Sequence, residues 1–114
     1  MSKFSMFGNF FNTSDVDTFA ILVVRELVKG LPPQHLDTQS KQAEKARTRI
    51  DDKVRSHAQQ LVDNHRLNIY QKAKLGGRLQ DGLLAAGYPE SFSKSFAYDV
   101  VRLVALTSTQ THPK

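Results

Sequence analysis

The stretch KLGGRLQDGLLAAGYPES, residues 74–91, has four glycines in a segment whose leucines recur at helical spacing. Leu75, Leu79 and Leu83 are each four residues apart, so they share one face of a helix. A phosphate-binding loop would need its glycines between a strand and a helix, followed by Lys-Ser or Lys-Thr, and this stretch has neither feature. The pattern therefore predicts that residues 68–87 form a helix that does not bind a nucleotide.

The glycines inside this helix need a reason, because each costs about 1 kcal/mol relative to alanine in a helix interior. Gly77 shares a second face of the helix with Tyr70 and Ala73. We expect Gly77 to let a neighbouring helix approach the backbone closely, whereas the pattern offers no reason for Gly82. Gly87 differs from both, because a glycine that ends an apolar helix and is followed by Tyr and Pro is typical of a helix C-cap.

Residues 39–65, which precede this helix, predict a longer and more polar one. Opposite charges recur three or four residues apart, the spacing at which side chains meet on a helix surface. The apolar side chains form one narrow stripe, which suits a helix on the outside of a bundle or against a partner helix. That stripe consists of Ala43, Ala46, Ile50, Val54, His57, Ala58 and Leu61.

Two more apolar helices complete the prediction, over residues 14–31 and 89–107. Ser14 is a typical N-cap, and Gly30 followed by two prolines ends the first of these helices. Its apolar run FAILVV would also suit a β-strand, an alternative that the sequence leaves open. The second helix begins at a proline and is expected to turn one apolar set inward: Phe92, Phe96, Val100, Leu103 and Val104.

Together these segments predict an all-α fold, a small four-helix bundle in a single domain over residues 14–107. One domain with one core suits a chain of 114 residues. Residues 1–13 are a predicted aromatic N-terminal arm, and residues 108–114 are a polar tail that we expect to be disordered. The arm carries phenylalanines at helical spacing as candidate contacts to a partner: Phe4, Phe7, Phe10 and Phe11.

The composition excludes several classes of protein. Without cysteine the chain has no disulfide, no thiol nucleophile and no cysteine-ligated metal, which fits the reducing cytoplasm where we expect this protein. The longest strongly apolar run, residues 19–24, is far shorter than the roughly 20 residues that cross a bilayer. We therefore predict no membrane span.

No arrangement of residue types predicts catalysis or metal binding. His57 and His65 are two helical turns apart, too far along one helix to share an ion unaided. Asp51 and Asp52 are adjacent and diverge by about 100° around a helix, which does not suit a shared acid–base pair. No serine lies in a nucleophile-elbow motif. We predict a non-enzymatic protein without catalytic residues, metal, cofactor or small-molecule substrate.

Positive charge is unevenly distributed along this chain of net charge +5, because residues 41–78 hold ten basic side chains and four acidic ones. Two hypotheses follow. The first is a small helical interaction protein that docks on a protein partner or on itself through apolar surfaces. The alternative is weak, sequence-nonspecific binding of nucleic acid through residues 41–78. The candidate phosphate contacts are Lys45, Arg49, Lys53, Arg55, Arg66, Lys74 and Arg78.

Overall fold

The computed structural model describes residues 12–111. Within this range the chain forms four α-helices, one short 3₁₀ turn and no β-strand. These elements are α2 (Ser14–Gly30), η1 (Pro33–His35), α3 (Lys41–Asn64), α4 (Ile69–Ala86) and α5 (Glu90–Thr111). The all-α prediction is confirmed, and the run FAILVV is helical. Phe4, Phe7, Phe10 and Phe11 of the predicted arm lie outside the described residues.

One predicted N-cap and one predicted helix end are wrong, whereas the predicted start at residue 14 is confirmed. Ser14 is the first helical residue and not the N-cap; the carboxamide of Asn12 instead accepts a hydrogen bond from the Ser14 amide at 2.9 Å. At the other end, α5 continues to Thr111, four residues beyond the predicted end at 107. Polar side chains alone do not end a helix, and the first helix-breaking residue after position 107 is Pro113. The helix therefore continues past the predicted end.

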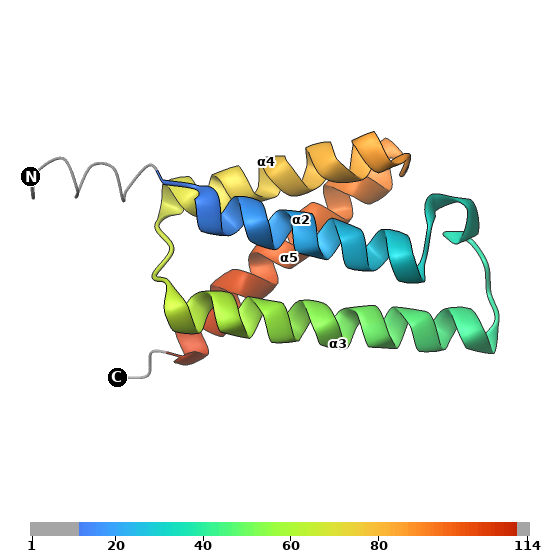
Figure 1. Ribbon diagram of the computed structural model, residues 1–114, viewed down its shortest axis with the longest axis horizontal. Coiled ribbons are helices and arrows are strands. Elements are labelled where there is room, and N and C mark those ends of the chain that lie inside the picture. The colour runs from blue at the N-terminus through green and yellow to red at the C-terminus, as the bar shows by residue number, and fades with distance from the viewer. Residues whose placement is uncertain (1–11, 112–114) are drawn as a thin grey trace, which may run out of the picture.

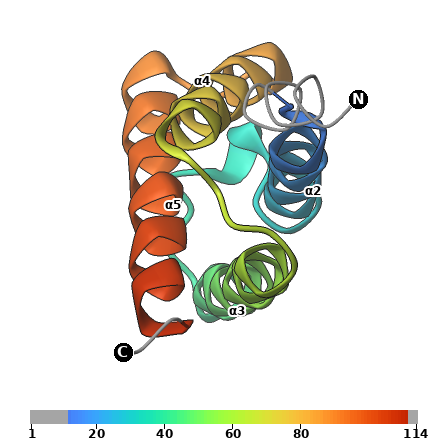
Figure 2. The ribbon, with the colours of Figure 1, turned by 90° about the vertical axis from the view of Figure 1, so that its left-hand side faces the viewer.

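The helices pack in a ring, with the cyclic order α2, α3, α5, α4 given by their main contacts. Figure 1 shows α4, α2 and α3 running side by side, while α5 crosses diagonally behind them from α4 to α3. Figure 2, which looks along the first three helices, shows α5 running along one side from α4 to α3. The α2–α4 contact and the α3–α5 contact therefore lie at opposite edges of the ring.

The core fills the interior of this ring with aliphatic side chains. Leu75, Leu79 and Leu83 of α4 are completely buried, as their helical spacing predicts. Each of the other helices contributes a stripe of its own, in which Val23 of α2 and Val104 of α5 are also completely buried. The narrow stripe predicted for α3 is largely confirmed, with five of its members buried: Ala43, Ile50, Val54, Ala58 and Leu61.

Of the two roles predicted for glycines at α4, one is wrong and the other is confirmed. The expected close packing at Gly77 is wrong: the residue is exposed, and a Cβ atom built there would meet no described atom within 4 Å. Close approach occurs at Gly82 instead, where a Cβ atom would lie 3.1 Å from Cγ2 of Val24 in α2. Gly87 is the predicted C-cap, with φ of 104° and a left-handed conformation that favours glycine.

Candidate functional site

A groove of about 860 Å³ opens between α3 and α5 and is called here the α3–α5 groove. It forms because α5 lies close to α3 at the C-terminal ends of both helices and diverges from it toward their N-terminal ends (Figure 1). The C-terminal half of α2 and the segment around η1 close its base. Its apolar floor includes Leu27, Ile50, Val54, Phe92, Phe96 and Leu103.

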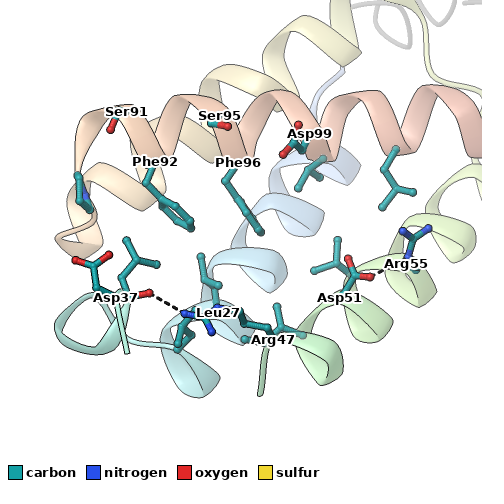
Figure 3. Close-up of a pocket in the computed structure, with 17 residues that line it drawn as sticks. Leu27, Asp37, Arg47, Asp51, Arg55, Ser91, Phe92, Ser95, Phe96 and Asp99 are labelled. Carbon is teal, nitrogen blue, oxygen red and sulfur yellow. Dashed lines mark hydrogen bonds and ion pairs between the residues drawn. The ribbon is translucent and has the colours of Figure 1, made fainter. Parts of the chain in front are cut away.

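Three aromatic rings lie in a row along the start of α5. The ring centroids of Tyr88 and Phe92 are 5.3 Å apart, and those of Phe92 and Phe96 are 5.5 Å apart with nearly parallel planes. These distances are within the range of favourable ring contacts. Phe92 and Phe96 are only partly buried and point into the groove (Figure 3). The prediction that they face inward is thus correct for one side of each ring, while the other side borders the groove.

Tyr88 anchors this row of rings to the rest of the bundle. Its hydroxyl group donates a hydrogen bond of 2.8 Å to the backbone carbonyl of Leu31, at the end of α2. The side chain is buried, and burial raises the pKa of Tyr88 to about 12 because the charged phenolate loses its hydration. The start of α5, and with it the groove wall, is therefore held to the end of α2.

Charged side chains surround the apolar floor. Arg47 closes one end by donating hydrogen bonds to the carbonyl groups of Leu36 and Thr38, at 2.9 and 3.0 Å. Arg55 forms an ion pair with Asp51 at 3.1 Å, seen on the α3 side in Figure 3. Two further carboxylates also line the groove and have no ion pair with a residue in the range 12–111: Asp37 and Asp99.

This rim has an excess of negative charge, although the whole chain is positive. It holds three carboxylates, those of Asp37, Asp51 and Asp99, against the guanidinium groups of Arg47 and Arg55. Arg55 and Asp51 offset each other in their ion pair, so the excess consists of Asp37 and Asp99 against Arg47, which keeps its charge while it donates to the backbone carbonyl groups. The groove therefore combines an aromatic floor with a rim that attracts positive charge.

The basic residues predicted to contact phosphates do not share one surface. Lys53 points toward α2, where it forms an ion pair with Glu26 at 3.4 Å, whereas Arg55 lines the groove on the α5 side of α3. The remaining members divide between exposed positions on α3, the α3–α4 connection and α4: Lys45, Arg49, Arg66, Lys74 and Arg78.

Two of those on α4 already have contacts. Arg78 is bonded to Asp17 of α2 at 2.8 Å, and this hydrogen bond raises the pKa of Arg78 further above its ordinary value. Lys74 lies over the ring of Tyr70, 5.6 Å from its centroid. The positive excess in the sequence is therefore spread around the bundle and partly neutralised.

The groove was not predicted from the sequence, although part of its signal is there. In SFSKSFAYD, residues 91–99, Phe92 and Phe96 form one stripe on α5 and Ser91, Ser95 and Asp99 form the stripe beside it. Such a change from aromatic to small polar side chains on one helix is typical of a boundary between core and surface. The diverging angle between α3 and α5, which opens the groove, has no such signal.

Within residues 12–111, no helix is long and apolar enough to cross a membrane, and no group of three or more metal-binding side chains is placed to hold an ion. The chain was also compared with family models, curated proteins and solved structures, and none of these comparisons finds a match. The geometry of the α3–α5 groove is therefore the basis for the functional argument.

Proposed function

We propose that this protein is a non-enzymatic docking protein, and that its α3–α5 groove binds an apolar, positively charged segment of a protein partner. The observation that supports this most directly is the exposure of the Phe92 and Phe96 rings in a groove whose rim has excess carboxylates. Aromatic side chains in partly desolvated pockets contribute much of the binding energy at protein interfaces. The two rings are the proposed anchors.

The shape of the groove favours a peptide segment over a small molecule. Small-molecule sites are usually enclosed and carry a few polar groups that converge on the ligand. Here the polar groups lie on the rim and the floor is apolar, an arrangement that suits the apolar face of a helix laid into a groove. Positively charged side chains on the other face of that helix would lie near Asp37, Asp51 and Asp99.

The nucleic-acid alternative has less support from the structure. Lys53, Arg55 and Arg78 are in ion pairs, and Arg55 borders carboxylates that would repel a phosphate backbone. Docking on a protein through the groove accounts for more of the geometry than phosphate binding through scattered cations.

A synthetic probe tests this proposal. The probe is a fluorescein-labelled amphipathic helical peptide with Leu and Phe on one face and Lys on the other, and a second peptide has Glu in place of every Lys. We expect saturable binding of the Lys peptide in fluorescence anisotropy and at least tenfold weaker binding of the Glu peptide. Equal affinity for the two peptides, or no binding of either, would contradict the proposal.

Substitutions locate the binding site. Phe96→Ser removes a groove anchor and should weaken binding of the Lys peptide at least about tenfold. Tyr98→Ser is the matched control, because Tyr98 is 66% exposed, outside the groove on the same helix, and should leave the affinity unchanged. Asp99→Arg reverses an exposed rim charge without touching the core and should weaken binding even if Phe96→Ser disturbs folding. Circular dichroism checks the fold of each variant.

A further inference from the structure

We propose that the segment bound by the α3–α5 groove is residues 1–11 of a second copy of this chain, so that the protein forms a dimer by reciprocal exchange of these segments. The inference rests on the proposed function, because it names the partner for the same groove. Three properties of the molecule lead to it: the chemistry of residues 1–11, the place where this segment joins the bundle, and the symmetry of the exchange.

The sequence of residues 1–11 has the chemistry that the groove selects. It contains four phenylalanines, two methionines and Lys3, and the first acidic residue of the chain is Asp15. Phenylalanine rings suit the exposed faces of Phe92 and Phe96, with which they can stack. A segment with a lysine and no carboxylate also suits a rim where carboxylates outnumber guanidinium groups.

The size of the groove is adequate for several of these side chains. Its volume of about 860 Å³ is within the roughly 300–1,000 Å³ typical of pockets that hold drug-sized ligands. Fully extended, eleven residues span at most roughly 36 Å, which is longer than the first turns of α5 that carry the two rings. A segment of this length can therefore place more than one phenylalanine along the floor.

Residues 1–11 join the bundle at the edge opposite the groove. Asn12 is held at the start of α2, where its side-chain oxygen accepts hydrogen bonds from the amide and hydroxyl groups of Ser14 at 2.9 and 2.8 Å. Its carbonyl oxygen accepts a third hydrogen bond, 2.7 Å long, from the side chain of Gln71 in the first turn of α4. The attachment point thus lies at the α2–α4 edge, across the ring from α3 and α5 (Figure 2).

This arrangement favours a second copy as the source of the segment. To enter the groove of its own copy, the segment would first have to pass around the bundle from the α2–α4 edge. A second copy can approach with its α2–α4 edge beside the groove and insert its segment directly. Because the two edges lie on opposite sides of the ring, contact between edges alone would give an open head-to-tail chain. In the proposed dimer the copies instead pack face to face about a twofold axis that turns each α2–α4 edge onto the α3–α5 edge of the other, so both grooves are filled and the assembly is closed.

The test measures self-association of the full chain by sedimentation velocity over a range of concentrations. One variant carries Phe4→Ser, Phe7→Ser, Phe10→Ser and Phe11→Ser, and a second carries Asp99→Arg in the groove rim. We expect the wild type to dimerise with increasing concentration and the four-Ser variant to dimerise at least about 30-fold more weakly, the loss typical of removing an interface anchor. The Asp99→Arg variant should also dimerise more weakly than the wild type, because it reverses a charge on the groove rim. Tyr98→Ser is again the control that should dimerise like the wild type.

Mixing the two variants provides a sharper test of exchange. The four-Ser variant keeps an intact groove, and the Asp99→Arg variant keeps an intact segment, so one segment–groove contact can form between them. We expect the mixture to associate more strongly than either variant alone. A mixture that associates no better than its components would overturn the exchange.

Other outcomes separate this inference from the proposed function. A wild type that stays monomeric at high concentration overturns the second copy as the partner. If the four-Ser variant then binds the Lys peptide more tightly than the wild type does, the segment occupies the groove of its own copy. If it binds the peptide equally well, docking stands and the partner is another protein. If it binds no peptide at all, the proposed function fails as well.

Discussion

The two opposite edges of this bundle are built from the same kind of helix but differ in how closely the helices meet. At the α2–α4 edge, Gly82 allows Val24 to approach within 3.1 Å of the position that a Cβ atom would occupy. The ion pair between Arg78 and Asp17 crosses the same edge. At the α3–α5 edge, the helices diverge around the rings of Phe92 and Phe96, and a groove remains.

The difference shows how side-chain size decides which helix contacts close and which leave a groove in so small a protein. A glycine lets two helices pack closely, so α2 and α4 are in direct contact at Gly82, beside a depression of about 490 Å³ in which Ile21 remains 58% exposed. Large aromatic side chains on a diagonally crossing helix cannot be covered by a single neighbour, so one side of each ring stays accessible. We therefore expect mutations at the closed edge to change folding, and mutations at the open edge to change binding.

The largest expected effect is in the core side of α4. Leu75→Ala removes a completely buried side chain and should lower the free energy of unfolding by about 2–5 kcal/mol. Leu103→Ala removes a partly buried side chain from the groove and should cost about 1 kcal/mol, since part of its surface already contacts water. Urea denaturation measures both values. Equal losses would contradict the distinction between the buried core face of α4 and the partly open groove.

The next largest effect is a dependence of stability on pH, and we expect it from Tyr88, which joins the end of α2 to the start of α5. Burial raises its pKa from 10.0 to about 12, so the folded protein holds the phenolic proton more tightly than the unfolded chain does. The stabilisation of the folded state that comes from this protonated hydroxyl group is complete below pH 10 and is lost as the pH rises from 10 to about 12. Two pH units correspond to about 2–3 kcal/mol of unfolding free energy.

The Tyr88→Phe variant isolates this contribution, because it removes the hydroxyl group but keeps the ring. Wild type and variant should be compared by urea denaturation at several pH values between 9 and about 12, a range that spans the ordinary pKa of 10.0 and extends to the raised one. Their difference in stability should shift in favour of the variant as the pH rises above 10, because the unfolded wild type ionises at Tyr88 while the folded wild type must keep the proton that Tyr88 donates to Leu31. Parallel pH profiles for the two proteins would show that Tyr88 has the same pKa in the folded and unfolded states.

Alanine substitutions of two glycines in α4 allow an exposed position and a packed position to be compared within one helix. Gly77→Ala should stabilise the protein by up to about 1 kcal/mol, because alanine favours the helix and its Cβ meets no described atom. Gly82→Ala gains the same propensity but forces its Cβ against Val24, so its stabilisation should be smaller or absent. Thermal unfolding of the two variants checks the order. A larger gain from Gly82→Ala would show that α2 and α4 separate easily.

Most of the fold could be predicted from the sequence, because helices depend on local periodicity and local end signals. The three core leucines of α4 and the C-cap at Gly87 are examples. The packing of the glycines could not be predicted in this way. Whether Gly77 or Gly82 faces a neighbour depends on where α2 lies against α4, and both positions look alike in a helical pattern.

The candidate site was less predictable for a related reason. A list of basic residues suggested one positive region, but Lys53 and Arg55, two positions apart, lie on opposite sides of α3 and have different acidic partners. The groove itself depends on the angle between α3 and α5. Helix crossing angles are set by side chains that interlock across the interface, and the periodicity of one helix contains no information about them.

The smallest expected effects on stability come from two arginines, one at each edge, and they sharpen the comparison because their functional consequences differ. Arg78→Met removes an ion pair between α2 and α4, so the unfolding midpoint should fall slightly at low salt. That loss should vanish in about 1 M NaCl, where the screening length is about 3 Å.

Arg55→Met removes a pair within a single helix and should change stability by less than about 0.5 kcal/mol. However, it leaves Asp51 unpaired on the groove rim, so the variant should bind the Lys peptide more tightly than the wild type. Anisotropy titrations in low and high salt, with Arg78→Met as the control whose affinity stays unchanged, measure this gain. A loss of peptide affinity in Arg55→Met would mean that the rim does not select positive charge.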